Sequence, residues 1–221
     1  MKRFHIARIG AYLALAILLS TLGGCAGKEE TGPAGEARQP VSTNASPMDS
    51  LAKSMRAQLA TKSFRARISS STQNVPGEFV VEYVAPDRLH MTNPTSELIA
   101  VGSETYTRQS GGPWQKAPMN ANEMAAKFRD PKLIDELEKN YNVALIGPDT
   151  LDGLPMMVYE YSPKSPSPQT PAGKTKVWIG ADDSLPRKIE VETEVGGQKS
   201  MTKILYSDYN ADIKIELPVK G

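Results

Sequence analysis

Residues 64–116 read FRARISSSTQNVPGEFVVEYVAPDRLHMTNPTSELIAVGSETYTRQSGGPWQK. Short runs that alternate apolar and polar residues, or that are rich in β-branched and aromatic residues, follow one another with almost no room for helices between them. Turn-forming residues separate the runs at Pro76-Gly77, Pro86-Asp87, Asn93-Pro94, Gly102 and Gly111-Gly112. This spacing is typical of antiparallel strands joined by short turns, so the stretch predicts a β-meander.

Helices and a second set of strands accompany the meander. Residues 48–59 repeat apolar residues at helical spacing and predict a helix that either packs on the sheet or partly plugs a cavity. Residues 121–141 predict two short helices that break at Asp130-Pro131, because proline cannot continue a helix but suits a new first turn. Further strands are expected at 143–146, 156–161, 176–179, 187–195, 200–206 and 212–217.

These elements predict a mainly β (α+β) fold made by a single domain, residues 48–221. No internal repeat and no parallel crossover unit is visible in the sequence. So many strands in one antiparallel sheet require strong curvature, and the helices are expected to cover the open face of that sheet. Such a curved sheet encloses either an apolar pocket or a packed core, and the sequence leaves both open.

The chain begins with an export signal. Lys2, Arg3 and Arg8 are followed by an apolar run at 9–19, which is shorter than the roughly 20 residues of a membrane span. The run ends in Leu22-Gly23-Gly24-Cys25, which resembles a bacterial lipobox. We expect residues 1–25 to be a lipoprotein signal peptide that ends at the lipidated Cys25. An ordinary cleaved signal with an incidental cysteine and an uncleaved anchor helix are the alternatives.

Residues 26–47 are expected to be a flexible tether, since Gly, Pro, Ala, Glu, Ser and Thr dominate the segment and bury little surface. Cys25 is the only cysteine, so no intrachain disulfide can stabilise the domain. Two or three acyl chains such as palmitate on Cys25 would anchor the chain stably, at about 0.8 kcal/mol per buried methylene. Because Ala26 rather than aspartate follows, we expect the outer membrane, facing the periplasm, in a host with two membranes.

The sequence lacks the patterns of an enzyme, a metal protein or a nucleic-acid-binding protein. Outside the signal, His90 is the only histidine, and we expect it at the surface or rim. Nucleophile elbows, glycine-rich phosphate loops and paired-cysteine zinc spacings are missing. Asp182-Asp183 is interpreted as a turn rather than a calcium site. With 26 basic and 25 acidic residues the charge is near balance. We therefore expect no catalysis, no metal, no cofactor and no nucleic acid.

Several stretches together resemble the LolA/LolB-like superfamily of bacterial lipoprotein carriers, whose fold the mycobacterial lipid-binding lipoproteins share. These stretches are Tyr106-Thr-Arg, Gly112-Pro-Trp-Gln-Lys, Asp152-Gly153, Val158-Tyr-Glu-Tyr and VWIGADDSLPRKIEV at 177–191. The resemblance implies an unclosed β-barrel of about eleven strands, with helices over its mouth and an apolar concavity that holds acyl chains. It also implies an arginine on an early strand that holds the helical lid, for which Arg65 and Arg67 are the candidates. The soluble carrier of the family has a plain signal, whereas Cys25 and the tether resemble the membrane-anchored acceptor.

The alternation along the predicted strands indicates which side chains face the concavity. We expect the acyl-chain lining to comprise Phe64, Phe79, Val81, Tyr83, Leu89, Met91, Met156, Val158, Val177 and Ile179. The alternative is that the same residues pack only against the helices.

Three functional hypotheses follow. The first is a tethered envelope lipoprotein that binds acyl chains of lipids or lipoproteins and carries or accepts them, as in outer-membrane lipoprotein sorting. The second is a non-catalytic regulatory protein of the same fold that senses envelope stress through a partner protein. The third is a structural lipoprotein with a filled core.

Overall fold

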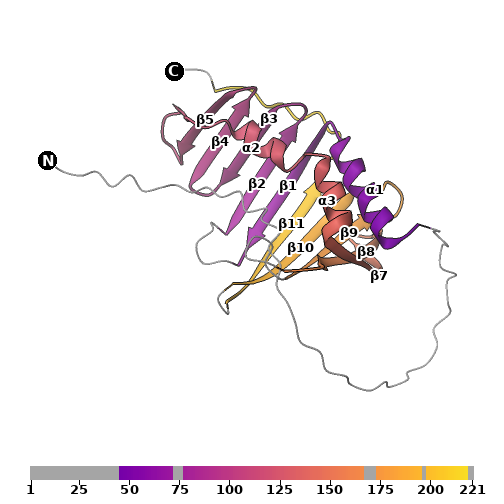
Figure 1. Cartoon of the computed structure of the whole chain (residues 1–221). Helices are drawn as coiled ribbons and strands as arrows, with labels where there is room; N and C mark the ends of the chain where they lie inside the picture. Colours follow the sequence, from indigo (N-terminus) through magenta and orange to yellow (C-terminus); the bar gives the residue numbers. More distant parts are fainter. Residues whose placement is uncertain (1–44, 72–76, 167–172, 196–197, 219–221) are drawn as a thin grey trace.

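The computed structural model of the chain describes residues 45–71, 77–166, 173–195 and 198–218 (Figure 1). The predicted signal peptide, Cys25 and all but the last residues of the predicted tether lie outside these ranges. None of the helices within them is both long and apolar enough to cross a membrane.

In the described part of the chain the helices are α1 Pro47–Leu59, α2 Ala121–Lys127 and α3 Lys132–Asn140. The strands before α2 are β1 Ser63–Ser70, β2 Glu78–Val84, β3 Arg88–Asn93, β4 Ser96–Val101, β5 Glu104–Gln109 and β6 Gln115–Lys116. Those after α3 are β7 Tyr141–Leu151, β8 Leu154–Pro163, β9 Gly173–Gly180, β10 Pro186–Val195 and β11 Gln198–Ser207.

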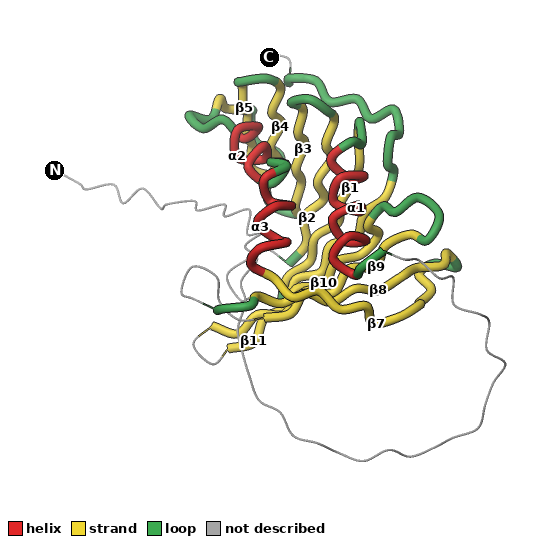
Figure 2. The backbone as a smooth tube through the Cα atoms, turned by 45° about the vertical axis from the view of Figure 1, so that its right-hand side comes forward, coloured by secondary structure: helices red, strands yellow, loops and turns green. Residues whose placement is uncertain are grey.

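All strands belong to one 11-stranded antiparallel sheet in the order β6-β5-β4-β3-β2-β1-β11-β10-β9-β8-β7. Each half of the chain forms a meander, and β1 pairs with β11 to join the two halves. The two edge strands, β6 and β7, do not pair with each other, so the barrel is not closed. The three helices lie over one face of the sheet (Figures 1 and 2). The predicted mainly β fold with an open, helix-covered sheet is confirmed.

The helices begin and end where local chemistry favours it. Ser46 caps α1 in a capping box with Asp49, and Pro47 occupies the first turn, where its missing N–H costs nothing. Asn120 caps α2 by accepting hydrogen bonds from two backbone N–H groups. Pro131 precedes α3, which confirms the predicted break between two short helices.

The core lies between the helices and the sheet and is divided between the two meanders. In the first meander and the adjoining β11, buried Ala66, Val81, Leu89, Ala100 and Ile204 pack with Ala121 of α2. In the second meander, buried Tyr159, Val177 and Ile179 pack with Leu51 of α1 and Leu137 of α3. Ile189 of β10 packs against both clusters and connects them.

The predicted strand at 212–217 is wrong. After β11 the backbone turns through Asp208 and Asn210, which both have positive φ. Asn210 then bonds to the start of β1, donating from its N–H to the Ser63 carbonyl at 2.9 Å. Because β11 is already paired on both sides, the chain does not continue as a neighbouring strand. It carries the buried Ile215, whose carbonyl accepts a hydrogen bond from Arg88 at the start of β3.

Candidate functional site

The face of the sheet beneath the helices is apolar across both meanders. Strand pairing sets Phe64 opposite Tyr83 and Ala66 opposite Val81, so their side chains lie on the same face. Val81 is in turn opposite Met91, and Val177 is opposite Ile189. Eight of the predicted lining residues lie on this covered face: Phe64, Phe79, Val81, Tyr83, Leu89, Met91, Val177 and Ile179.

The placement of Met156 and Val158 on this face is wrong. In the register of β8 and β9, Met157 lies opposite Ile179 and Tyr159 opposite Val177. Met156 and Val158 therefore point away from the helices, where they pack with Trp178. The run Met156-Met-Val-Tyr has no polar residue to distinguish one face from the other, and a shift of one residue exchanges the faces.

The two predicted lid arginines also lie on the face opposite the helices. Arg65 bonds to Glu82 at 2.7 Å and to Asp208, and Arg67 pairs with Glu78 at 3.1 Å. Alternation explains the error, because these arginines flank Ala66, which faces the helices. Neither guanidinium therefore holds the lid.

Arg129 lies in the α2–α3 linker rather than on an early strand, and it is the arginine that contacts both the helices and the sheet. Its guanidinium carbon lies 4.3 Å from the centre of the Tyr83 ring and 5.7 Å from that of Phe64. Its Nη2 donates a hydrogen bond of 2.8 Å to the carbonyl of Leu59, the last residue of α1. A single side chain thus joins both helical segments to the rim of the sheet. The sequence signal was its position directly before Asp130-Pro131, the break between the helices.

Aromatic side chains gather beneath Arg129. Phe64 stacks on Tyr83 at 5.3 Å and meets the edge of Tyr206 at 5.7 Å, and Tyr206 stacks on Tyr209 at 6.1 Å. Burial raises the pKa of the Tyr206 and Tyr209 hydroxyls, although the nearby charge of Arg129 opposes the rise. The aromatic group therefore lies between two guanidinium groups, Arg129 over Tyr83 and Arg187 over Tyr209 at 5.0 Å.

The helices cover the face unevenly. α1 packs on β7 and β10, and α2 packs on β3 and β4. On β1 and β2, between those regions, Ile68 and Phe79 remain only partly buried, as does Met91 on β3. The apolar face therefore keeps accessible surface in the middle of the sheet.

Two cavities flank the central strands. The cavity at the rim beneath the helices has a volume of about 300 Å³ and is bounded by Leu59, Tyr83, Asn122 and Arg129. A cavity of about 430 Å³ lies mainly on the opposite face, between the arginines of β1 and the β7–β8 hairpin.

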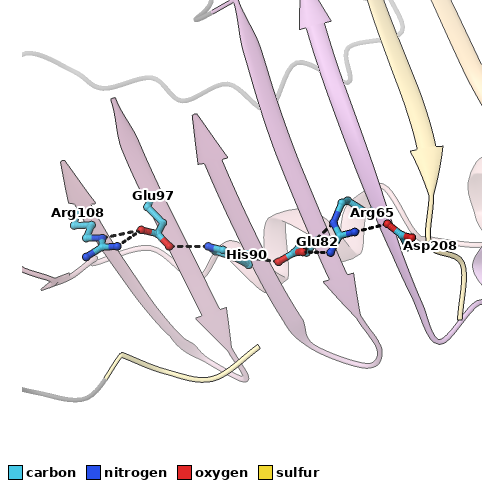
Figure 3. A network of polar contacts seen from close by, with 6 residues as sticks. All are labelled: Arg65, Glu82, His90, Glu97, Arg108 and Asp208. Carbon is cyan, nitrogen blue, oxygen red and sulfur yellow. Dashed lines mark hydrogen bonds and ion pairs between the residues drawn. The ribbon is translucent and has the colours of Figure 1, made fainter. Parts of the chain in front are cut away.

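The face opposite the helices carries an ordered row of charges (Figure 3). Both ring nitrogens of His90 contact carboxylates, Glu82 at 2.9 Å and Glu97 at 2.8 Å. Arg65 binds the other side of Glu82, and Arg108 binds Glu97 at 2.6 Å. Burial favours the neutral form of both carboxyls, but hydrogen bonds from His90 and the arginines outweigh it and hold their pKa values below the ordinary range. His90 is thus a partly buried member of this row. No cluster of three or more metal-ligating side chains occurs in the residues that the structure describes.

Comparison with solved structures identifies the architecture. The lipoprotein LppX of Mycobacterium tuberculosis matches with a TM-score of 0.59 and 12% identity, over 77% of this chain and 98% of that chain. LprF of Mycobacterium bovis also has a TM-score of 0.59, with 15% identity over 78% of this chain and 96% of that chain. The chain shares the fold of these two mycobacterial lipoproteins.

The open sheet with helices over one face is the architecture that the resemblance implied (Figure 2). No protein-family model and no curated protein matches the sequence of this chain. The match is therefore to the fold alone.

Proposed function

We propose that this protein is a tethered lipoprotein of the bacterial envelope that binds acyl chains of lipids or lipoproteins on the covered face of the sheet. The observation that carries the proposal is the continuous apolar face, on which Ile68, Phe79 and Met91 remain partly accessible. A purely structural protein would gain stability by covering these side chains completely. A hydrocarbon chain supplies the missing contacts.

The energy of such binding is large enough to keep an acyl chain out of water once it has left a membrane. Each methylene removed from water contributes about 0.8 kcal/mol, so a chain of about twelve contributes on the order of 10 kcal/mol before ordering costs. Methionine and aromatic side chains such as Met91 and Phe79 adapt to flexible ligands. The protein acts by reversible burial and needs no catalytic group.

Entry of a chain requires movement of the helical cover. α2 is short, and its apolar contacts with the sheet run through the small side chains Ala121 and Ala125. Small contacts are the easiest to replace with a ligand, because little apolar area is lost on separation. We infer that the C-terminal end of α2 and its linker move, whereas the start of α2 stays held by Asn122 and α1 stays anchored through the fully buried Leu51.

The proposed location follows from the start of the chain. Lipidated Cys25 would hold the protein on the membrane, and residues 26–47 would let the domain reach its cargo, at a root-mean-square distance on the order of 25 Å. We propose the periplasmic face of the outer membrane in a host with two membranes.

The test uses two neighbouring residues that lie on opposite faces of β2. The chain with Cys25→Ala is purified, extracted with organic solvent and analysed by mass spectrometry for bound lipid. Phe79→Lys places a charge on the covered face and should reduce bound lipid at least tenfold. Val80→Lys places the same charge on the opposite face at similar burial and should leave it unchanged. Equal effects of the two variants, or a lipid-free protein, would refute acyl-chain binding on this face.

One observation favours a protein partner as the second candidate. β7 is an edge strand, and its Leu145 and Ile146 are 47% and 56% exposed. Exposed edges accept an added strand from another chain. If regulation through a partner is the function, Ile146→Lys should abolish a cross-linked complex in the envelope without changing bound lipid.

A further inference from the structure

The rim cavity beneath the helices combines an apolar wall with two polar groups. Its volume is about 300 Å³, near the lower end of small-molecule pockets. Leu59, Tyr83, Ala85, Pro86 and Ala126 line it together with two polar residues, Asn122 and Arg129. It therefore lies where α1 ends, where α2 begins and where β2 turns into β3.

Asn122 presents a hydrogen-bond acceptor that nothing in the described chain uses. Its Nδ2 donates to the carbonyls of Asp87 at 2.6 Å and Gly102 at 2.8 Å, so both amide hydrogens are used. These bonds also fix the orientation of the amide, because a flip would set oxygen against two carbonyls. Its Oδ1 is buried and has no partner among the described residues. Such an acceptor is costly unless a donor reaches it.

Arg129 presents a positive charge that no described carboxylate neutralises. Its hydrogen bond to the Leu59 carbonyl uses one of five N–H donors, and its guanidinium lies over Tyr83. The neighbouring Asp130 is turned to the start of α3, where it accepts from the Lys132 N–H. By contrast, Arg65 and Arg108 on the other face are each paired with a carboxylate. The cavity therefore carries net positive charge.

A guanidinium with spare donors suits an anion, and a buried amide oxygen suits a hydroxyl or ammonium group. Tyr83 stacks on Phe64, and both lie on the apolar face proposed above for acyl chains. We propose that the rim cavity binds the headgroup of an anionic amphiphile, a phosphate or carboxylate with a hydroxyl or ammonium beside it. This assignment rests on the proposed function and specifies its ligand class, with Arg129 contacting the anion and Asn122 accepting from the neighbouring donor.

The test compares two ligands with the same acyl chain. Lysophosphatidylglycerol carries a phosphate and hydroxyls, whereas the matching monoacylglycerol is neutral. Calorimetric titration of the chain with Cys25→Ala should show at least tenfold tighter binding of the anionic ligand. Arg129→Gln should remove most of this difference, since a charge-assisted bond is lost only with the anion. The readout is the ratio of the two affinities, because loss of the contacts that Arg129 makes with Tyr83 and Leu59 acts on both ligands.

A second pair of variants leaves Arg129 in place. Ala126 is an exposed residue that lines the cavity, and Lys127 is its exposed neighbour outside the lining. Ala126→Glu should weaken lysophosphatidylglycerol about tenfold. Lys127→Glu changes the charge more but should have an effect below about twofold at physiological salt, where charges are screened over about 8 Å.

The outcomes separate this inference from the function on which it rests. Equal affinity for both ligands, with no effect of Ala126→Glu, would overturn the headgroup site and leave acyl-chain binding intact. Failure of both ligands to bind would overturn both. If inorganic phosphate alone binds as tightly as lysophosphatidylglycerol, the cavity recognises free phosphate. The proposal that the anion belongs to a lipid headgroup is then wrong.

Discussion

Arg129 lies over the ring of Tyr83, with 4.3 Å between its guanidinium carbon and the ring centre, and so connects the helical linker to β2. We predict that Arg129→Ala destabilises the protein by about 2 kcal/mol. The variant removes a cation–π contact of about 0.5–2 kcal/mol and a charged hydrogen bond to the Leu59 carbonyl. Denaturant unfolding measures the loss, and hydrogen exchange should quicken at the end of α1 and in α2.

The matched control for Arg129 is Arg56 on α1, which makes an exposed ion pair with Glu138 at 3.6 Å. Arg56→Ala should cost no more than about 0.5 kcal/mol. Equal losses in the two variants would contradict a role for Arg129 in holding the lid.

The charge row on the opposite face predicts acid sensitivity. The pKa values of Glu82 and Glu97 are lowered in the folded protein, so the unfolded chain binds protons first as the pH falls below 4.5, the ordinary value. The stabilisation that these two carboxylates contribute is therefore fully present above pH 4.5. It declines as the pH falls through their lowered pKa values. Unfolding measured across this range should show a shallower decline in Glu82→Gln, whereas Glu138→Gln, outside the row, should retain the slope.

Alkaline conditions test the burial of Tyr161. Burial raises the pKa of this hydroxyl to about 12. In the unfolded chain the Tyr161 hydroxyl loses its proton from about pH 10, whereas in the folded protein it keeps the proton to about pH 12. The folded state therefore loses stability as the pH rises from about 10 to about 12. Absorbance titration should reveal several late-ionising tyrosines, and their number should fall by one in Tyr161→Phe. Ionisation of all 8 tyrosines together near the ordinary value would contradict the burial.

Two neighbouring residues of β11 lie on opposite faces of the sheet, so their substitution by alanine should destabilise the protein to different extents. Ile204 is 1% exposed and lies in the core beneath the helices, whereas Leu205 points to the other face and is partly exposed. Ile204→Ala should cost about 2–4 kcal/mol, because it leaves a cavity in a packed core. Leu205→Ala should cost about 1 kcal/mol. Denaturant unfolding compares them, and a reversed order would contradict the assignment of the covered face.

Local pattern was enough to predict most of the fold. Turn residues and alternation located the strands of the first meander, and Pro131 located the break between α2 and α3. Eight of the ten predicted lining residues lie on the covered face, and polar neighbours on both sides mark that face at Phe64, Leu89 and Met91. Met156 and Val158 failed where this alternation is absent, since consecutive apolar side chains fit either face.

The sequence by itself determined an antiparallel sheet with short helices and the order in which these elements follow, because strand, turn and cap preferences act between near neighbours. Only the tertiary structure decided that β1 pairs with β11, that Arg129 rather than Arg65 reaches the lid, and that Asn122 and Arg129 share a cavity. These relationships join residues far apart in the chain. They depend on the curvature and register of the whole sheet, which no local pattern specifies.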